Sequence, residues 1–249
     1  MGCSIKAPTA IRPLIVAELQ GFEKQRYVAN LFSRISGRYD LMNDLMTLGM
    51  HRSWKRRTAT IATQGVHGPV IDVSCGTGDL ALVLAKRPEV DRTVGLDLLK
   101  GMIVQADAKS KAAGLAKSVT CMTGDALSLP FSDNSFACAT AGFSLRNMPS
   151  VEKALSEMIR VVRPGGRVAI LELSPMGPGI KSTLFRPIFH GIVPLIGKLV
   201  AGDESAYSYL PRSVDYFLEA DRLAEMLSTL GLNGVEFQRL GFGTVAIHW

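Results

Sequence analysis

Three aspartates stand where short apolar segments of the sequence end, and a glycine-containing turn follows the first of them. Asp72 lies in the apolar run of residues 70–73, which leads into the turn at residues 74–78. Asp97 closes a second such run, and Asp125 follows a third. Ligands of parallel sheets bind at the carboxyl ends of the strands, so we expect these carboxylates to converge on one site.

The turn after the first run is suited to a ligand held by backbone. Gly76 and Gly78 let the chain approach a ligand closely, and the helix that follows offers unpaired N–H groups. Ala81 replaces the third glycine of a dinucleotide fingerprint, but that position also admits alanine, so spacing alone leaves a dinucleotide open. Asp72 favours a cationic or amine-bearing ligand over a pyrophosphate. A P-loop is excluded, because no Gly-Lys-Ser/Thr follows.

The acids of the next two segments extend the pattern. Asp97, 19 residues after Gly78, can accept hydrogen bonds from both hydroxyls of a ribose. At Asp125 and Ala126, a carboxylate and a backbone N–H can read the edge of an adenine. The three successive acids therefore point to S-adenosylmethionine as the cofactor. Helix capping is the simpler alternative for Asp97 and Asp125.

The elements that must position these residues alternate between strand and helix. Apolar runs and the turns between them predict strands over residues 70–73, 93–96, 119–122, 136–141, 167–173, 235–240 and 244–248. Helical spacing predicts helices over 80–86, 99–113, 151–162 and 222–230. This alternation with short links indicates an α/β fold, a doubly wound and mostly parallel seven-stranded sheet.

Two regions stand outside this alternation. Residues 21–63 carry apolar side chains at helical spacings and predict N-terminal helices. Residues 175–213 form a long insertion rich in Pro, Gly, Phe and Ile, which is typical of a lid or binding element; an extra core helix is the alternative. Residues 1–20 are expected to be loosely ordered, which leaves 21–249 as a single domain.

Composition and charge exclude several classes of protein. The chain has 249 residues, of which 47% are hydrophobic and 20% charged, as in ordinary globular proteins. It contains no apolar run of about 18 residues, the length needed to span a bilayer. Its four cysteines lack paired spacing, so we expect no disulfide framework and no metal site, and a cytoplasmic location. Residues 1–69 hold ten Lys and Arg against four Asp and Glu, and thus the whole net charge of +6. That excess is either a solvated face or a contact with anionic membrane, whereas nucleic acid is disfavoured because no aromatic residues interleave it.

Five further segments carry a resemblance to a known family. They are Tyr39-Asp40-Leu41-Met42-Asn43 through His51 to Trp54, Leu145-Arg146-Asn147, Arg160-Val161-Val162-Arg163-Pro164-Gly165-Gly166 through Glu172, Ala206-Tyr207-Ser208-Tyr209-Leu210-Pro211, and the end at residues 241–248. Over roughly residues 30–249 the chain resembles the ubiquinone/menaquinone biosynthesis C-methyltransferases of the UbiE type. One departure is that the family's Ser-Phe-Gly reads here as Gly142-Phe143-Ser144, which moves the hydroxyl by two positions.

The resemblance implies a Rossmann-like class I methyltransferase and a prenylated quinol as substrate. The implied reaction is the S-adenosylmethionine-dependent C-methylation of demethylmenaquinol to menaquinol, of 2-polyprenyl-6-methoxy-1,4-benzoquinol, or of both. By match to the family motif, the cofactor contacts fall to Thr77, Asp97, Asp125 and Ala126, and Gly142 stands at the position of the family's serine.

The chemistry of such a transfer suggests roles for five residues. A quinol ring becomes a carbon nucleophile once a hydroxyl is ionised, and that carbon must lie in line at about 3–3.5 Å from the methyl group. Arg146 is a candidate to stabilise the phenolate, Asn147 to orient the hydroxyl or a water, and His51 to act as general base. Tyr39 and Tyr209 are candidates to bind quinol oxygens. The simpler alternatives are that Arg146 only pairs with an acid and that His51 is structural.

Two rival functions stay open on the sequence alone. One is another small-molecule methyltransferase acting on O or N, although the apolar insertion disfavours a polar substrate. The other is a cofactor-binding, non-catalytic component of a quinone-synthesis assembly. A prenyl tail must come from the bilayer. Burial in lipid is worth about 25 cal/mol per Å² of apolar area, so the tail leaves lipid only if an apolar groove of the protein receives it. The basic N-terminal quarter could then hold the protein on the membrane surface, and a homo-oligomer is also open.

Overall fold

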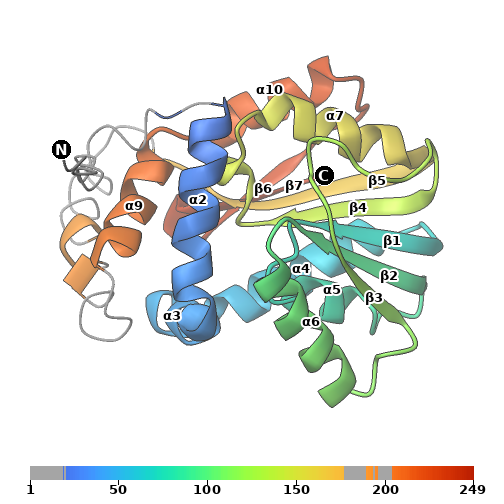
Figure 1. Cartoon of the computed structure of the whole chain (residues 1–249). Coiled ribbons are helices and arrows are strands. Elements are labelled where there is room, and N and C mark those ends of the chain that lie inside the picture. Colours follow the sequence, from blue (N-terminus) through green and yellow to red (C-terminus); the bar gives the residue numbers. More distant parts are fainter. Residues whose placement is uncertain (1–18, 20, 177–188, 193, 196–203) are drawn as a thin grey trace, which may run out of the picture.

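A central sheet with helices on both faces forms the body of the protein, and further helices stand at one edge, as the computed structural model in Figure 1 shows. The structure describes residues 19, 21–176, 189–192, 194–195 and 204–249. The prediction for residues 1–20 lies almost wholly outside the described residues, and most of the predicted lid at 175–213 does too.

The sheet has seven strands in the order β3-β2-β1-β4-β5-β7-β6. The strands are β1 (Gly68–Val73), β2 (Val90–Asp97), β3 (Val119–Thr123), β4 (Phe136–Gly142), β5 (Val162–Leu173), β6 (Phe237–Leu240) and β7 (Val245–His248). Neighbours from β3 to β5 are parallel, and β7 is antiparallel to both β5 and β6. This confirms the predicted doubly wound, mostly parallel sheet. The strand order reverses between β1 and β4, and that switch point is where such sheets bind ligands.

Both faces of the sheet are covered, which is why its central strands read as continuous apolar runs. On one face, α7 (Val151–Val161) and α10 (Ala220–Thr229) bury Leu155, Met158, Leu223 and Leu227. On the other, α4 (Met50–Thr63) and α5 (Asp79–Leu84) bury Ala59, Ala62, Leu80 and Leu84. Alongside α5 runs α6 (Lys100–Ala112), between β2 and β3 (Figure 1).

One predicted boundary differs in an informative way. The predicted fifth strand begins at Arg167, after a Pro-Gly-Gly turn, whereas β5 already begins at Val162. The three turn residues form an irregularity within the strand, because β4 pairs Phe136 with Val162 but Cys138 with Arg167. A Cβ at Gly166 would lie 2.5 Å from the Ala137 carbonyl oxygen, so this close approach requires glycine.

The N-terminal helices stand against the carboxyl edge of the sheet (Figure 1). They are α2 (Gly21–Ile35), the short 3-10 helix η1 (Ser36–Arg38) and α3 (Tyr39–Thr47), and they lead into α4 on the face of the sheet. The helical pattern of 21–63 is therefore interrupted, most sharply at Leu48 and Gly49, whose φ values of 49° and 74° end α3 in a left-handed turn.

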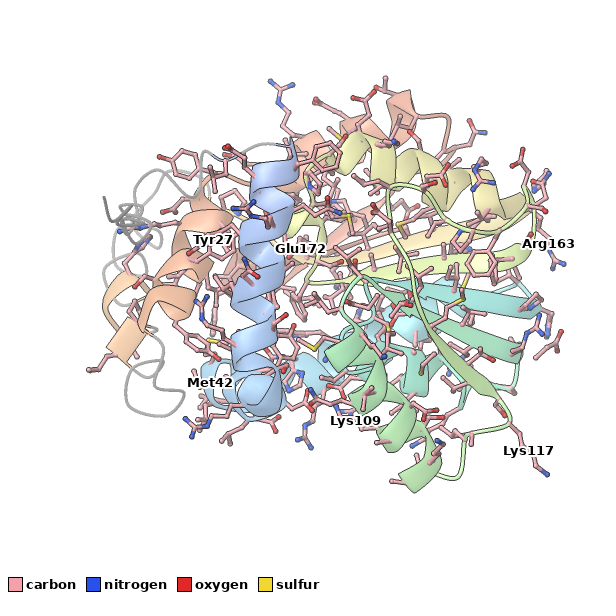
Figure 2. The ribbon with its side chains drawn as sticks, in the orientation of Figure 1. Tyr27, Met42, Lys109, Lys117, Arg163 and Glu172 are labelled. Atoms are coloured by element: carbon pink, nitrogen blue, oxygen red, sulfur yellow. The ribbon has the colours of Figure 1, made fainter. Side chains whose placement is uncertain are left out.

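The helix α9 (Glu204–Asp215) lies beside α2. In Figure 2 the side chain of Tyr27, on α2, points toward α9, and its ring lies 5.8 Å from that of Tyr209. Leu31, Ile35, Met42 and Tyr207 complete this buried cluster. In the part of the chain that the structure describes, no helix is both long enough and apolar enough to cross a membrane.

Candidate active site

Two cavities open at the carboxyl edge of the sheet. The smaller, of about 120 Å³, is called here the strand-end cavity and is lined mostly by residues that follow the strands, among them Ser74, Gly76, Asp97, Asp125, Ala126 and Gly142. The larger, of about 770 Å³, is the helix-side cavity, and side chains of the added helices line most of it, among them Leu31, Met42, Met46, Trp54, Tyr207 and Leu210. Phe32, Tyr39 and Phe143 line both cavities, so the two share a wall.

The turn after β1 brings backbone to the strand-end cavity. Ser74 and Gly76 both have a φ of 55°, and the Gly76 N–H donates to Asp97 Oδ2 at 2.9 Å. Gly78 lines neither cavity. A Cβ there would lie 2.9 Å from the Cβ of Ala106, so this glycine lets the turn pack closely on α6.

Asp97 ends β2 at the strand-end cavity and is 8% exposed. Its Oδ1 accepts the Leu99 N–H at 2.9 Å, while its Oδ2 accepts from Gly76. Burial raises the pKa of the Asp97 carboxyl, although these N–H groups oppose the shift. Because a carboxylate has about four acceptor positions, Asp97 keeps capacity for ligand hydroxyls while it holds the turn in place.

Asp125, Ala126 and Gly142 also line the strand-end cavity. Asp125 Oδ1 accepts the Leu127 N–H at 2.9 Å, and its Oδ2 faces the Gln25 amide at 3.4 Å. The contact with Gln25 brings α2 over the cavity. No sequence signal singles out Gln25, because it lies a hundred residues from its partner.

Asp72 lines neither cavity. It is buried in β1, and its Oδ1 accepts from the Thr140 hydroxyl at 2.7 Å. Burial raises the pKa of Asp72 to about 7, against the opposing effects of Thr140, Lys55 and the Ala81 N–H. The carboxyl therefore titrates near neutral pH, where a cationic ligand above the turn would favour its ionised form.

Thr77 also lies outside both cavities, inside a charged network that joins the N-terminal helices to the sheet. Its hydroxyl donates to Asp40 Oδ1 at 2.7 Å and accepts from Lys109 Nζ at 2.9 Å. Lys109 and Lys55 both bind Asp79, at 2.7 and 2.8 Å. Burial would raise the pKa of Asp79, but the two lysines outweigh it and hold the pKa at about 2.

Arg146 lies in the short 3-10 helix η2 (Leu145–Asn147) after β4 and lines the helix-side cavity. Its Nη1 pairs with Glu172 Oε1 at 2.7 Å, its backbone N–H faces Glu172 Oε2, and its Nε faces the Ser213 hydroxyl at 3.3 Å. The side chains of the pair are 6% and 1% exposed. The pairing with an acid, which the simpler alternative for Arg146 required, is therefore present. Glu172 was not predicted as a site residue, although it lies inside a family motif.

Asn147 follows Arg146 but lines the strand-end cavity, so η2 presents one side chain to each cavity. Tyr209, on the helix side, donates its hydroxyl to Asn147 Oδ1 at 3.2 Å. Burial raises the pKa of Tyr209 to about 12, against the effect of Arg146. Tyr39, in the shared wall, also has a raised pKa because it is buried. Both phenols are protonated at neutral pH and can donate hydrogen bonds.

His51 lies in the first turn of α4, is 3% exposed and lines the helix-side cavity. Its Nε2 lies 2.8 Å from Asp44 Oδ1, and its buried Nδ1 has no hydrogen-bond partner among the described residues. Burial lowers the pKa of His51, against the opposing effect of Asp44. A neutral imidazole whose Nε2–H donates to Asp44 leaves a lone pair on Nδ1, as a general base requires. Asp44 was missed because a turn separates it from His51.

The strand-end cavity fits S-adenosylmethionine. Carboxylates at its rim can accept ribose hydroxyls, and backbone at Gly76 and Ala126 lies open to a close ligand. At Asp72 a buried carboxyl that ionises near neutral pH suits a donor that carries positive charge.

The strand order, with β7 inserted antiparallel, and a ligand cavity at the switch point define the fold of the Rossmann-like methyltransferases. Solved structures agree. An S-adenosylmethionine-dependent methyltransferase from Thermotoga maritima has a TM-score of 0.62 at 14% identity, over 89% of this chain and 97% of its own. Phosphoethanolamine N-methyltransferase 2 from Haemonchus contortus, in complex with S-adenosylmethionine, has a TM-score of 0.57 at 17% identity, over 76% of this chain and 38% of its own.

The chain belongs to the ubiE/COQ5 methyltransferase family, whose model matches residues 20–249. A demethylmenaquinone methyltransferase from Thermus thermophilus is 39% identical over 88% of this chain and 98% of its own. A ubiquinone/menaquinone biosynthesis C-methyltransferase UbiE from Legionella pneumophila is 38% identical over 91% of each chain. These matches confirm the resemblance drawn from the motifs.

Proposed function

We propose that this protein transfers a methyl group from S-adenosylmethionine to a ring carbon of a prenylated quinol. The names of its relatives, which act on demethylmenaquinone or in ubiquinone and menaquinone biosynthesis, support this substrate class. The observation that carries the proposal is the shared wall of Phe32, Tyr39 and Phe143, with a small cavity that presents two aspartates on one side and a large, mostly apolar cavity on the other.

The helix-side cavity suits a prenyl tail. Its lining is dominated by Leu, Ile, Met and aromatic side chains, and methionines such as Met42, Met46 and Met50 adapt to irregular apolar ligands. Burial of each apolar Å² is worth about 25 cal/mol, so this surface can offset the transfer of the tail out of lipid. The ring would then lie beside Tyr39, at the boundary with the strand-end cavity.

S-adenosylmethionine, when bound, supplies an electrophilic methyl group on a positively charged sulfur. The carboxylates of Asp97 and Asp125 would hold its ribose and adenine, with the backbone of Gly76 and Ala126 beside them. Asp72 and Thr77 would act from behind the turn, since neither lines the cavity.

The residues of the helix-side cavity would prepare the quinol ring to attack the methyl group. His51 Nδ1 would take the proton of one quinol hydroxyl, and Asp44 would stabilise the imidazolium that forms. Arg146 would stabilise the phenolate, since Glu172 holds its guanidinium in place. The Nη2 atom of Arg146 makes no hydrogen bond with another described residue and could bind the phenolate oxygen. Tyr39 would donate to a ring oxygen, while Tyr209, whose proton is donated to Asn147, would accept a hydrogen bond from a ring hydroxyl.

The proton balance then restores an aromatic quinol. The new carbon–carbon bond forms as the carbon–sulfur bond breaks. The methylated ring carbon would afterwards lose its own proton to water, which restores an aromatic phenolate, and the phenolate oxygen would regain a proton from His51.

Incubation of the purified protein with donor carrying a trideuterated methyl group, and with short-tailed demethylmenaquinol or a 2-prenyl-6-methoxybenzoquinol, tests this proposal. We expect a product in which the label is on a ring carbon, identified by mass spectrometry and NMR. The oxidised quinones serve as controls, because without a hydroxyl to ionise they should gain no label. Label on oxygen, or none on either quinol, would overturn the proposal.

A further inference from the structure

The mouth of the helix-side cavity exposes large apolar side chains. Leu48, in the α3–α4 turn, is 86% exposed, and Phe242, in the β6–β7 turn, is 89% exposed. Both line the cavity, as do the exposed Met50 and Ile192. Several exposed apolar side chains that line one cavity are typical of an interaction surface.

Packing within the fold does not explain these two side chains. The φ values of Leu48 and Phe242 are 49° and 58°, in the left-handed region that disfavours bulky residues. A glycine or asparagine would suit either turn better. The side chains are nevertheless large, apolar and turned toward solvent.

The two turns lie on one side of the molecule. An added Cβ at Gly241 would lie 3.2 Å from the ring of Trp54, so the β6–β7 turn packs on α4. Leu48 stands immediately before α4. Met50, Trp54 and Arg57 recur at spacings of four and three, so they share one face of that helix.

Positive charge accompanies the apolar rim. Arg56 and Arg57 on α4 are exposed and make no hydrogen bond or ion pair with another residue of the described part of the chain. The acids of the cavity lining are Asp215, paired with His190, and Glu219. Apolar side chains flanked by arginines match the interface of an anionic bilayer.

We propose that this rim, formed by Leu48, Met50 and Phe242 with Arg56 and Arg57, docks the protein on an anionic lipid bilayer. The proposal rests on the proposed function, because a prenylated substrate resides in lipid. Docking by the rim places the mouth of the helix-side cavity against the membrane. A tail can then pass from lipid to protein without crossing water.

Co-sedimentation with quinone-free vesicles tests this directly. Vesicles of phosphatidylglycerol and phosphatidylcholine are compared with pure phosphatidylcholine. We expect L48S/F242S to weaken binding to the anionic vesicles at least about tenfold, from the lost apolar burial. R56E/R57E should weaken it by roughly fivefold per arginine and only where lipid is anionic.

Matched controls separate the rim from general effects. V104S removes a 59% exposed apolar side chain from α6, and R92E/K117E reverses two exposed charges at the opposite end of the sheet; Figure 2 shows Lys117 there. Neither control should change vesicle binding. Thermal melting and calorimetry with S-adenosylhomocysteine confirm that each variant is folded, since Leu48 and Phe242 lie outside the strand-end cavity.

The outcomes distinguish this proposal from the proposed function. Vesicle binding that depends on the rim without any methyl transfer supports docking and overturns the function. Methyl transfer in detergent with no vesicle binding by the wild type, or with L48S/F242S binding as the wild type does, overturns docking. If L48S/F242S instead dissociates a dimer seen by light scattering, the rim is a subunit interface and the proposal is wrong.

Discussion

The two cavities are built by different means. The strand-end cavity takes most of its shape from backbone and carboxylates at the ends of β1, β2, β3 and β4, held by the hydrogen bonds of the sheet, with side chains of α2 over them. The helix-side cavity takes its shape from side chains of helices packed against that edge. The sheet thus supplies a small site with two aspartates, suited to a charged donor, and the helices supply a large apolar volume suited to a tail. The groups able to move a proton or stabilise an anion, His51 and Arg146, lie on the helix side.

This division predicts that chemistry and donor binding separate under mutation. His51→Asn removes the proposed base, and we expect kcat to fall by about 10²–10⁴-fold, the usual contribution of a general base. The dissociation constant for S-adenosylhomocysteine should stay the same, because His51 lies outside the strand-end cavity. Steady-state kinetics and calorimetry measure both quantities.

Asp44→Asn is the companion variant. It retains a hydrogen-bond acceptor for His51 Nε2 at the 2.8 Å contact but removes the charge that stabilises the imidazolium. We expect a smaller loss of kcat than in His51→Asn, and a change in the acidic limb of the pH profile of kcat. Weaker donor binding with unchanged kcat in either variant would contradict the division between the cavities.

The buried ion pair between the cavities should have the largest effect on stability. Glu172→Gln leaves Arg146 charged and buried without its counter-ion, a change that costs about 3–5 kcal/mol. Urea unfolding measures it. Asp133→Asn, in a pair whose aspartate is 69% exposed, is the matched control and should cost under about 1 kcal/mol. Equal losses in both variants would show that the pair does not stabilise this junction.

Asp72 should give the strand-end side a distinctive pH dependence. Its pKa is about 7 in the folded protein, against 3.8 for an aspartate in water, the value expected once the chain unfolds. The folded state therefore holds a proton that the unfolded state has lost, and stability falls as pH rises between these values. From pH 5 to pH 8 this group should lower the free energy of unfolding by about 2–3 kcal/mol.

Urea unfolding of the wild type and of Asp72→Asn across this pH range measures that contribution. The variant should lose the decline, because an amide does not titrate. Donor binding should also release protons near pH 7 in the wild type, which calorimetry in buffers of different ionisation enthalpy detects. A parallel decline in both proteins would mean that another group is responsible.

Tyr209 should give the smallest effect. Tyr209→Phe removes the hydroxyl that donates to Asn147 across the junction, and a hydrogen bond of this kind contributes about 1 kcal/mol. We expect KM for the quinol to rise roughly fivefold, with donor affinity unchanged. Tyr216→Phe, at a 62% exposed position, is the control and should change neither value.

The strand-end cavity was largely predictable from the sequence, for a physical reason. Asp97 and Asp125 follow apolar runs, and parallel strands bring their carboxyl ends to one edge, so local pattern implies a shared site. Asp72 and Thr77 show the limit of this reasoning. The apolar run predicted Asp72 and the family motif predicted Thr77 as cofactor contacts. Whether each side chain points toward the ligand depends on tertiary packing, against β4 for Asp72 and against α3 and α6 for Thr77.

The helix-side cavity was predictable only through family motifs. His51, Arg146 and Tyr209 come from three separate elements, and no periodicity relates them. Asp44 and Glu172, which hold His51 and Arg146, carried no local signal of their roles. The predicted single domain, the general base and a homo-oligomer stay predictions.

The rings of Phe32, Tyr39 and Phe143 have one more consequence, for turnover. A ligand that displaces them on one side alters the space left on the other, and thermodynamic linkage makes this influence reciprocal. We therefore expect the release of the methylated quinol to be coupled to the release of S-adenosylhomocysteine. The rate of release should respond to the concentrations of both products.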